Sequence, residues 1–157
     1  MNRFIIADPA KCIGCRTCEV ACVVSHEANQ DCSGIKPATF SARIRVVKTG
    51  AFSTAVTCHH CEDAPCANVC PVGAIHRAQG AVIVEQSRCI GCKSCMIVCP
   101  FGAMDVTVVN DRAQALKCDL CQHRDSGPAC VEACPTSALR CVNPGQLRET
   151  RLRSQLV

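Results

Sequence analysis

Cysteine spacing constrains this chain more than any other feature of its sequence. Sixteen of its 18 cysteines fall into four groups of four within 157 residues. Two groups have the spacing C-x2-C-x2-C-x3-C, and the others widen the middle gap to four or to eight residues. Because internal repeats identify the repeating unit of a fold, these motifs are expected to organise the chain. They are Cys12, Cys15, Cys18, Cys22; Cys58, Cys61, Cys66, Cys70; Cys89, Cys92, Cys95, Cys99; and Cys118, Cys121, Cys130, Cys134.

We expect these cysteines to bind metal and not to form disulfides. The N-terminal apolar run stops at Asp8, far short of the 7–15 apolar residues of a secretory signal. A cytoplasmic location is therefore expected, and the cytoplasm keeps thiols reduced. Redox-active C-x2-C pairs do not account for motifs of four cysteines. No stretch approaches the roughly 20 apolar residues of a membrane span.

The spacing itself favours iron–sulfur clusters. C-x2-C-x2-C-x3-C-P is typical of bacterial ferredoxins, in which the fourth cysteine binds the other cluster of a pair. Three motifs end in Cys-Pro and continue as PVGAI (71–75), PFGAM (100–104) and PTSAL (135–139), whereas the first ends in Cys22-Val23. We expect Gly14 and Gly91 to let backbone amides approach cluster sulfur. Zinc is the main alternative, but zinc ribbons use cysteine pairs separated by a long spacer.

Composition agrees with clusters in the interior. The chain has four Phe and neither Trp nor Tyr, so large aromatic side chains cannot form its core in the ordinary way. Its formal net charge is +4. Four [4Fe-4S] clusters of about −2 each would bring that charge to about −4. The basic composition is therefore a poor argument for nucleic-acid binding, and no lysine-rich run supports it.

Short strands and turns are expected between the motifs. The β-branched segments 81–84 and 106–109 predict hairpin strands. The 35 residues between Cys22 and Cys58 are expected to form a loop plus a hairpin, with strands at 43–47 and 54–57, packed over the clusters. Residues 143–157 are expected to be a polar tail with one helical turn or more.

The four motifs resemble those of the iron–sulfur electron-transfer subunits of molybdopterin oxidoreductases, the family of the dimethyl sulfoxide reductase and formate dehydrogenase β subunits. The opening NRFIIADPAKCIGCRTCEVAC is most similar to small electron-transport proteins of the formate hydrogenlyase group. The resemblance covers residues 1–142. It implies an α+β polyferredoxin domain of two nested bacterial-ferredoxin-like modules, with short β-hairpins and short helices around four clusters. Motifs one and four form one module, and motifs two and three form the other.

The resemblance also implies four ligand sets, here named A to D. The residue at the position of Cys92 is bulkier in some relatives, which hold a three-iron cluster, so Cys92 implies four complete [4Fe-4S] clusters. The chain lacks the C-terminal membrane-anchoring helix of longer relatives, and no direct membrane attachment is expected. Set A is Cys12, Cys15, Cys18 and Cys134; set B is Cys118, Cys121, Cys130 and Cys22; set C is Cys58, Cys61, Cys66 and Cys99; set D is Cys89, Cys92, Cys95 and Cys70.

Two cysteines and two prolines outside the predicted ligand sets receive simpler interpretations. Cys32 and Cys141 are expected to be small buried hydrophobic residues, with partner contact or redox sensing as the alternative. Pro65 and Pro128 are expected to fix the turns that deliver Cys66 and the third cysteine of the last motif.

Five polar residues near the motifs are expected to face solvent. The imidazole rings of His59 and His60 are expected to be exposed. The alternative is that one of them donates a hydrogen bond to cluster sulfur and makes the reduction potential depend on pH. A solvated surface is expected at Lys117, Asp119 and Arg124. The alternative is that they contact a partner or tune the reduction potential of a cluster.

A chain with these motifs could have one of three functions. An electron carrier would pass single electrons through four clusters between a molybdopterin enzyme of the formate dehydrogenase type and a hydrogenase or soluble ferredoxin. An enzyme is disfavoured, because the chain lacks dinucleotide, phosphate-loop and nucleophile-elbow motifs and all sixteen motif cysteines are needed as ligands. A maturation factor for formate dehydrogenase or hydrogenase is the remaining alternative. We predict the carrier, with no catalytic residues.

Overall fold

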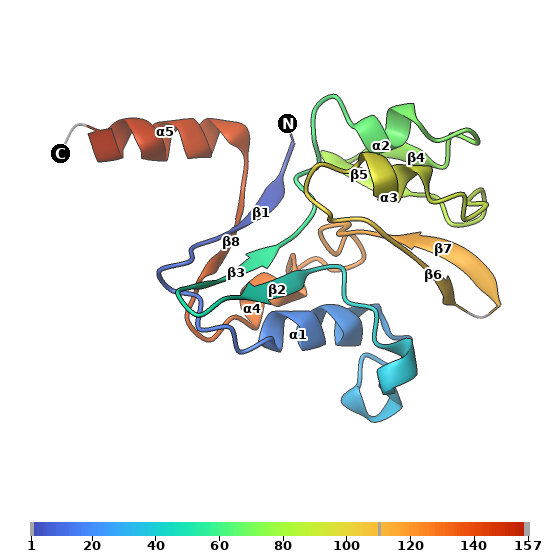
Figure 1. Cartoon of the computed structure of the whole chain (residues 1–157). Coiled ribbons are helices and arrows are strands. Elements are labelled where there is room, and N and C mark those ends of the chain that lie inside the picture. Colours follow the sequence, from blue (N-terminus) through green and yellow to red (C-terminus); the bar gives the residue numbers. More distant parts are fainter. Residues whose placement is uncertain (1, 110, 156–157) are drawn as a thin grey trace.

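The computed structural model describes residues 2–109 and 111–155 (Figure 1). Short helices alternate with short strands, and this mixture confirms the α+β class. Two 3-10 turns, Cys32–Gly34 and Pro37–Thr39, lie in the long segment after the first motif. The α-helices are α1 (Thr17–His26), α2 (Pro65–Asn68), α3 (Ser94–Val98), α4 (Ala129–Glu132) and α5 (Pro144–Gln155).

The strands form antiparallel pairs, not one continuous sheet. Three pairs are local hairpins, and they include the strands predicted at 43–47, 54–57, 81–84 and 106–109. They are β2 (Arg45–Lys48) with β3 (Ser53–Val56), β4 (Ile75–Ala78) with β5 (Ala81–Val84), and β6 (Asp105–Val109) with β7 (Arg112–Leu116). The fourth pair joins distant segments: β1 (Phe4–Ala7) lies beside β8 (Leu139–Val142), with Phe4 opposite Val142.

Helix length follows from the residue after the last cysteine of each motif. Helices α2, α3 and α4 have four or five residues and end just before a Cys-Pro pair. The residue before proline disfavours the helical conformation, so the chain leaves the helix there. Val23 replaces proline after Cys22, and α1 continues through both residues for ten residues in all.

The described residues form two hydrophobic cores. In what we call the α1/α4 region (β1, α1, β2, β3, α4 and β8), α1 packs against α4 around Ile5, Ile44 and Leu139. In the α2/α3 region (α2, β4, β5, α3, β6 and β7), α2 packs against α3 beside a core that includes Ile75 and Met104. Figure 1 shows the two regions side by side.

Strand β5 contributes to both cores. Ala81 and Ile83 pack in the α1/α4 core, whereas Val82 and Val84 pack in the α2/α3 core. Successive side chains of a strand point to opposite faces, so one short strand separates the two cores. The boundary between the regions therefore runs along β5.

The C-terminal tail is helical, as expected of a tail with one helical turn or more, and α5 runs for 12 residues. The Asn143 side chain accepts a hydrogen bond from the Gln146 amide (2.9 Å) where α5 begins, as an N-capping residue does. In Figure 1, α5 extends away from the two regions. Nowhere in the described ranges does a helix have the length and hydrophobicity that a membrane crossing needs.

Candidate metal centres

Three cavities are each lined by four motif cysteines and mostly apolar neighbours. Four thiolates are the ligands that a [4Fe-4S] cluster requires, and these cavities bring such groups of four together. The chemistry of the donors fits the expected cofactor. The lining cysteines are those of set A (Cys12, Cys15, Cys18, Cys134), set C (Cys58, Cys61, Cys66, Cys99) and set D (Cys70, Cys89, Cys92, Cys95).

The cysteines of set B lie together inside the α1/α4 region. Cys22, Cys118, Cys121 and Cys130 are all buried. Cys22, Cys118 and Cys130 pack in the same hydrophobic core, and burial together with neighbouring thiols raises the pKa of Cys130. A bound metal reverses that tendency, because a coordinating thiol loses its proton.

Solvent access differs among the four sets. Cys15 of set A and Cys92 of set D are exposed, and each follows an isoleucine with an exposed side chain, Ile13 (59%) and Ile90 (61%). Set B is wholly buried. Sets A and D therefore present sulfur and apolar side chains at the protein surface, whereas set B does not.

A five-residue segment begins at the proline of each Cys-Pro pair, and two of these segments bring a backbone amide close to cysteine sulfur. Their third residues, Gly73, Gly102 and Ser137, share a left-handed conformation with φ of 57°, 57° and 51°. In two of these segments the following residue is Ala74 or Ala138, and its backbone amide donates a hydrogen bond of 3.3 Å to the sulfur of the cysteine four residues earlier. Such hydrogen bonds to sulfur are among the features that set the reduction potential of a cluster.

Gly14 and Gly91 each lie close to a residue of a neighbouring hairpin. Both have positive φ, +69° and +68°. A Cβ on Gly91 would lie 2.3 Å from the Cβ of Ala113 in β7, and one on Gly14 would lie 3.2 Å from Ser53 in β3. Each glycine therefore lets a ligand loop pack closely against a hairpin. The expected approach of amides to cluster sulfur stays a prediction.

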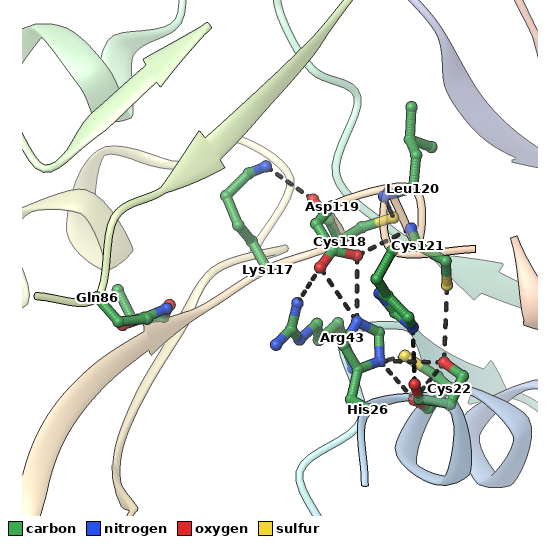
Figure 2. Close-up of polar contacts among 12 residues, drawn as sticks. Cys22, His26, Arg43, Gln86, Lys117, Cys118, Asp119, Leu120 and Cys121 are labelled. Carbon is green, nitrogen blue, oxygen red and sulfur yellow. Dashed lines mark hydrogen bonds and ion pairs between the residues drawn. The ribbon is translucent and has the colours of Figure 1, made fainter. Parts of the chain in front are cut away.

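A charged network lies beside set B (Figure 2). His26 Nε2 contacts the Asp119 carboxylate at 3.1 Å, and Arg43 Nη1 pairs with the same carboxylate. The Arg43 backbone amide also donates to Cys22 Sγ at 3.4 Å. Burial alone would lower the pKa of His26, but its hydrogen bonds to Asp119 and to Cys22 raise it to about 10. Burial would raise the pKa of Asp119, yet His26 and Arg43 hold it well below its usual range.

Lys117 is buried, contrary to the prediction of a solvated residue. Only 4% of it is exposed, and Nζ donates to the carbonyl oxygens of Val82 and Cys118. Burial raises the pKa of Cys61, Cys66 and Cys118, and the Lys117 ammonium opposes that rise in all three. Its charge thus reaches thiols of sets C and B. The predicted solvated surface is also wrong for the partly buried Asp119 and Arg124, whose side chains are 25% and 22% exposed.

His60 is also buried, so the expected solvent-facing imidazole is wrong. It is 0% exposed, and its Nδ1 accepts a hydrogen bond from the Val82 amide at 2.9 Å. Burial, with the Lys117 charge, lowers its pKa to about 3, so the ring is neutral and carries its proton on Nε2. That atom finds no hydrogen-bond partner among the described residues, and His60 lines the cavity of set C. A cluster sulfur accepting from Nε2 would satisfy this donor.

His59 is half-buried in an aromatic stack and does not extend freely into solvent. Its ring lies 3.8 Å from that of Phe101 and 5.6 Å from that of Phe4. His59 and Phe101 both line the cavity of set C. Two rings of the stack therefore line this cavity, and Phe4 packs on the outer side of His59.

The remaining predictions have mixed outcomes. Cys32 is exposed, which contradicts the predicted burial, whereas Cys141 is half-buried and packs against the α1/α4 core. Pro65 opens α2 directly before Cys66, and Pro128 precedes α4, as expected of prolines that fix these turns. The sequence offers no local signal that separates Cys32 from Cys141, since burial depends on distant segments.

Comparison with known proteins gives consistent matches. Residues 49–143 match a family described as 4Fe-4S dicluster domain, and residues 9–24 match one described as 4Fe-4S binding domain. The chain is 64% identical to the protein YsaA of Escherichia coli (strain K12) over the full length of both. It is 59% identical to electron transport protein HydN of that organism, over 95% of this chain and 93% of HydN. Formate hydrogenlyase subunit 2 of the same organism is 42% identical, over 91% of this chain and 83% of that protein.

Proposed function

The chain belongs to a family of iron–sulfur electron-transport proteins with 4Fe-4S domains, and from this premise we propose that it carries single electrons through four [4Fe-4S] clusters. Sixteen cysteines in sets A to D hold the clusters. The observation that carries the proposal is the grouping of twelve of these cysteines around three similar cavities, with the other four buried together.

The nested arrangement is part of the same proposal. The packing of α1 against α4, together with the β1–β8 pair, supports a module from motifs one and four. The packing of α2 against α3 supports a second module from motifs two and three. Residues 1–142 form the polyferredoxin domain, and residues 143–157 form a polar tail outside it.

The protein's own residues bind the clusters, shield them from solvent and adjust their reduction potentials. When bound, each cluster accepts or donates one electron, and no covalent bond is made or broken. Sets A and D, each with an exposed cysteine, would hold the clusters at which electrons enter and leave the protein. Ile13 and Ile90 offer apolar contacts at these two points, whereas the protein excludes water from set B.

The proposed partners are the catalytic subunit of a molybdopterin enzyme of the formate dehydrogenase type and a hydrogenase or other acceptor, in the cytoplasm. Similarity to formate hydrogenlyase subunit 2 supports this assignment. The chain is not proposed to be an enzyme, because a fully ligated cluster offers no open iron to a substrate.

Counting reactive thiols tests the ligand assignment. In the anaerobically purified protein, iodoacetamide should modify only Cys32 and, more slowly, the half-buried Cys141. After removal of iron with a chelator in denaturant, all 18 cysteines should react. Mass spectrometry gives both counts, with iron and acid-labile sulfide measured in parallel. Modification of motif cysteines in the loaded protein would contradict the sixteen-ligand assignment.

Kinetics distinguish the carrier from a maturation factor. The reduced protein should be reoxidised rapidly when mixed with its partner, and it should remain in the active complex during an anaerobic pull-down from native cells. A maturation factor would bind an incomplete enzyme and be absent from the active one. Slow reoxidation by every co-purifying oxidoreductase would contradict a carrier.

A further inference from the structure

Lys117 is a buried cation that the proposed electron path does not yet use. It follows β7 and precedes Cys118, and its Nζ donates to the carbonyls of Val82 and Cys118, the second at 2.8 Å. Lysine is almost never fully buried unless it is paired, because its charge loses hydration inside a protein. Two carbonyl dipoles do not neutralise that charge, so a negative partner is required.

No carboxylate supplies it. Within the part of the chain that the structure describes, the ion pairs involve arginines and His26 but not Lys117. Asp119, two residues away, already accepts from both Arg43 and His26. Figure 2 shows this carboxylate held between those two cations.

The proposed clusters of sets B and C lie on the two sides of Lys117. On one side, Cys118 is a member of set B. On the other, Val82 lines the cavity of set C and also donates to His60, which lines the same cavity. We propose that Lys117 is a shared counter-ion for the clusters of sets B and C, which face each other across the boundary between the two regions.

This role has a direct redox consequence and rests on the proposed ligand sets. Reduction by one electron takes a cluster with four thiolates from about −2 to about −3. A fixed positive charge therefore stabilises the reduced form. Because Lys117 lies between two sets, it stabilises an electron on either side of the boundary, and transfer between the regions avoids a large step in free energy.

Anaerobic redox titration followed by EPR tests the proposal. Lys117→Met removes the charge, and Lys11→Met is the matched control, since Lys11 precedes Cys12 as Lys117 precedes Cys118 but is exposed. At a fixed potential, the reduced-to-oxidised ratio of two of the four clusters should fall on the order of tenfold in Lys117→Met, a shift of about 59 mV. The other two clusters, and all four in Lys11→Met, should keep wild-type potentials.

Two further variants separate charge from hydrogen bonding. Lys117→Gln keeps a donor without the charge and should shift the same two potentials, whereas Lys117→Arg keeps the charge and should not. These two variants decide the question if Lys117→Met fails to take up iron. Wild-type potentials in Lys117→Gln, a shift of one cluster alone, or an equal shift of all four would overturn the shared role. Fewer than four clusters in the wild-type protein would instead contradict the proposed function.

Discussion

The α1/α4 and α2/α3 regions present nearly the same cysteine spacing, yet they cover their cysteines very differently. Five of eight motif cysteines are buried in the α1/α4 region, and one of eight, Cys95, is buried in the other. Solvent exposure and hydrogen bonds to sulfur set cluster potentials. The difference teaches that the motif selects the cofactor, while the sequence between motifs determines its surroundings.

The covering material comes from the segment between the first two motifs. It has 35 residues, against 18 between Cys70 and Cys89. The absence of proline after Cys22 lets α1 reach His26, and the long segment returns with Arg43 to complete the charged network. Glu19, buried in α1, accepts from the Val46 amide at 2.6 Å and holds the β2–β3 hairpin down.

Removing the one buried ligand of the α2/α3 region should have the largest effect. Cys95→Ser is expected to lose at least one cluster, about a quarter or more of the bound iron, and the fold around it, because cluster ligation contributes folding free energy. Iron analysis and far-UV circular dichroism measure the loss. Cys32→Ser, at an exposed cysteine outside the motifs, should match the wild type. Unchanged iron and spectrum in Cys95→Ser would contradict the contribution of ligation to this fold.

The second-largest difference between the two regions should come from adding one methyl group to a glycine of a ligand loop. Gly91→Ala brings a Cβ to 2.3 Å from Ala113, whereas Gly14→Ala meets nothing closer than 3.2 Å. Positive φ costs both variants about 1–2 kcal/mol, and the clash adds about 1–3 kcal/mol to Gly91→Ala alone. Anaerobic thermal melting should show the lower Tm for Gly91→Ala. Equal melting temperatures would mean that the β6–β7 hairpin moves aside freely.

The pH dependence should give the smallest difference. The pKa of His26, raised to about 10 by its hydrogen bonds against the effect of burial, lies above its unfolded value of about 6.5. Its stabilisation is therefore complete below about pH 6.5 and is lost as the pH rises towards 10, with a slope of at most about 1.4 kcal/mol per pH unit.

Tm measured anaerobically from pH 6.5 to 9.5 checks this slope. His26→Gln should flatten it, whereas His76→Gln, at an exposed position in β4, should keep the wild-type profile. A wild-type slope in His26→Gln would show that the charged network does not stabilise the α1/α4 region through protonated His26.

Local pattern sufficed for much of the fold. β-Branched runs beside turn residues located β5 and β6, and the alternation at 43–47 located β2, because hairpin strands depend on nearby sequence. The burial of Lys117 and His60 escaped prediction. Both side chains meet at Val82, which is 35 residues from one and 22 from the other, so no local window contains the contact.

The candidate site, like the fold, is predictable from local sequence only in part. Cysteine spacing predicts the donors, but it carries no information on why α1 is long, on the Asp119 network, or on which side of β5 each residue lies. Those features arise when segments distant in sequence pack together. Burial of an ionisable residue is decided by tertiary structure, and composition does not reveal it.

The pairing of β1 with β8 bears on the order of events during synthesis. Residues 58–116 contain all the cysteines of sets C and D, and they are synthesised before β8. Phe4, in contrast, can pair with Val142 only after β8 has been synthesised. Domains acquire structure as the chain emerges, N-terminal parts first, and contacts between distant residues form late. In this protein the α1/α4 region can therefore complete its β1–β8 pair only after its last strand has been translated.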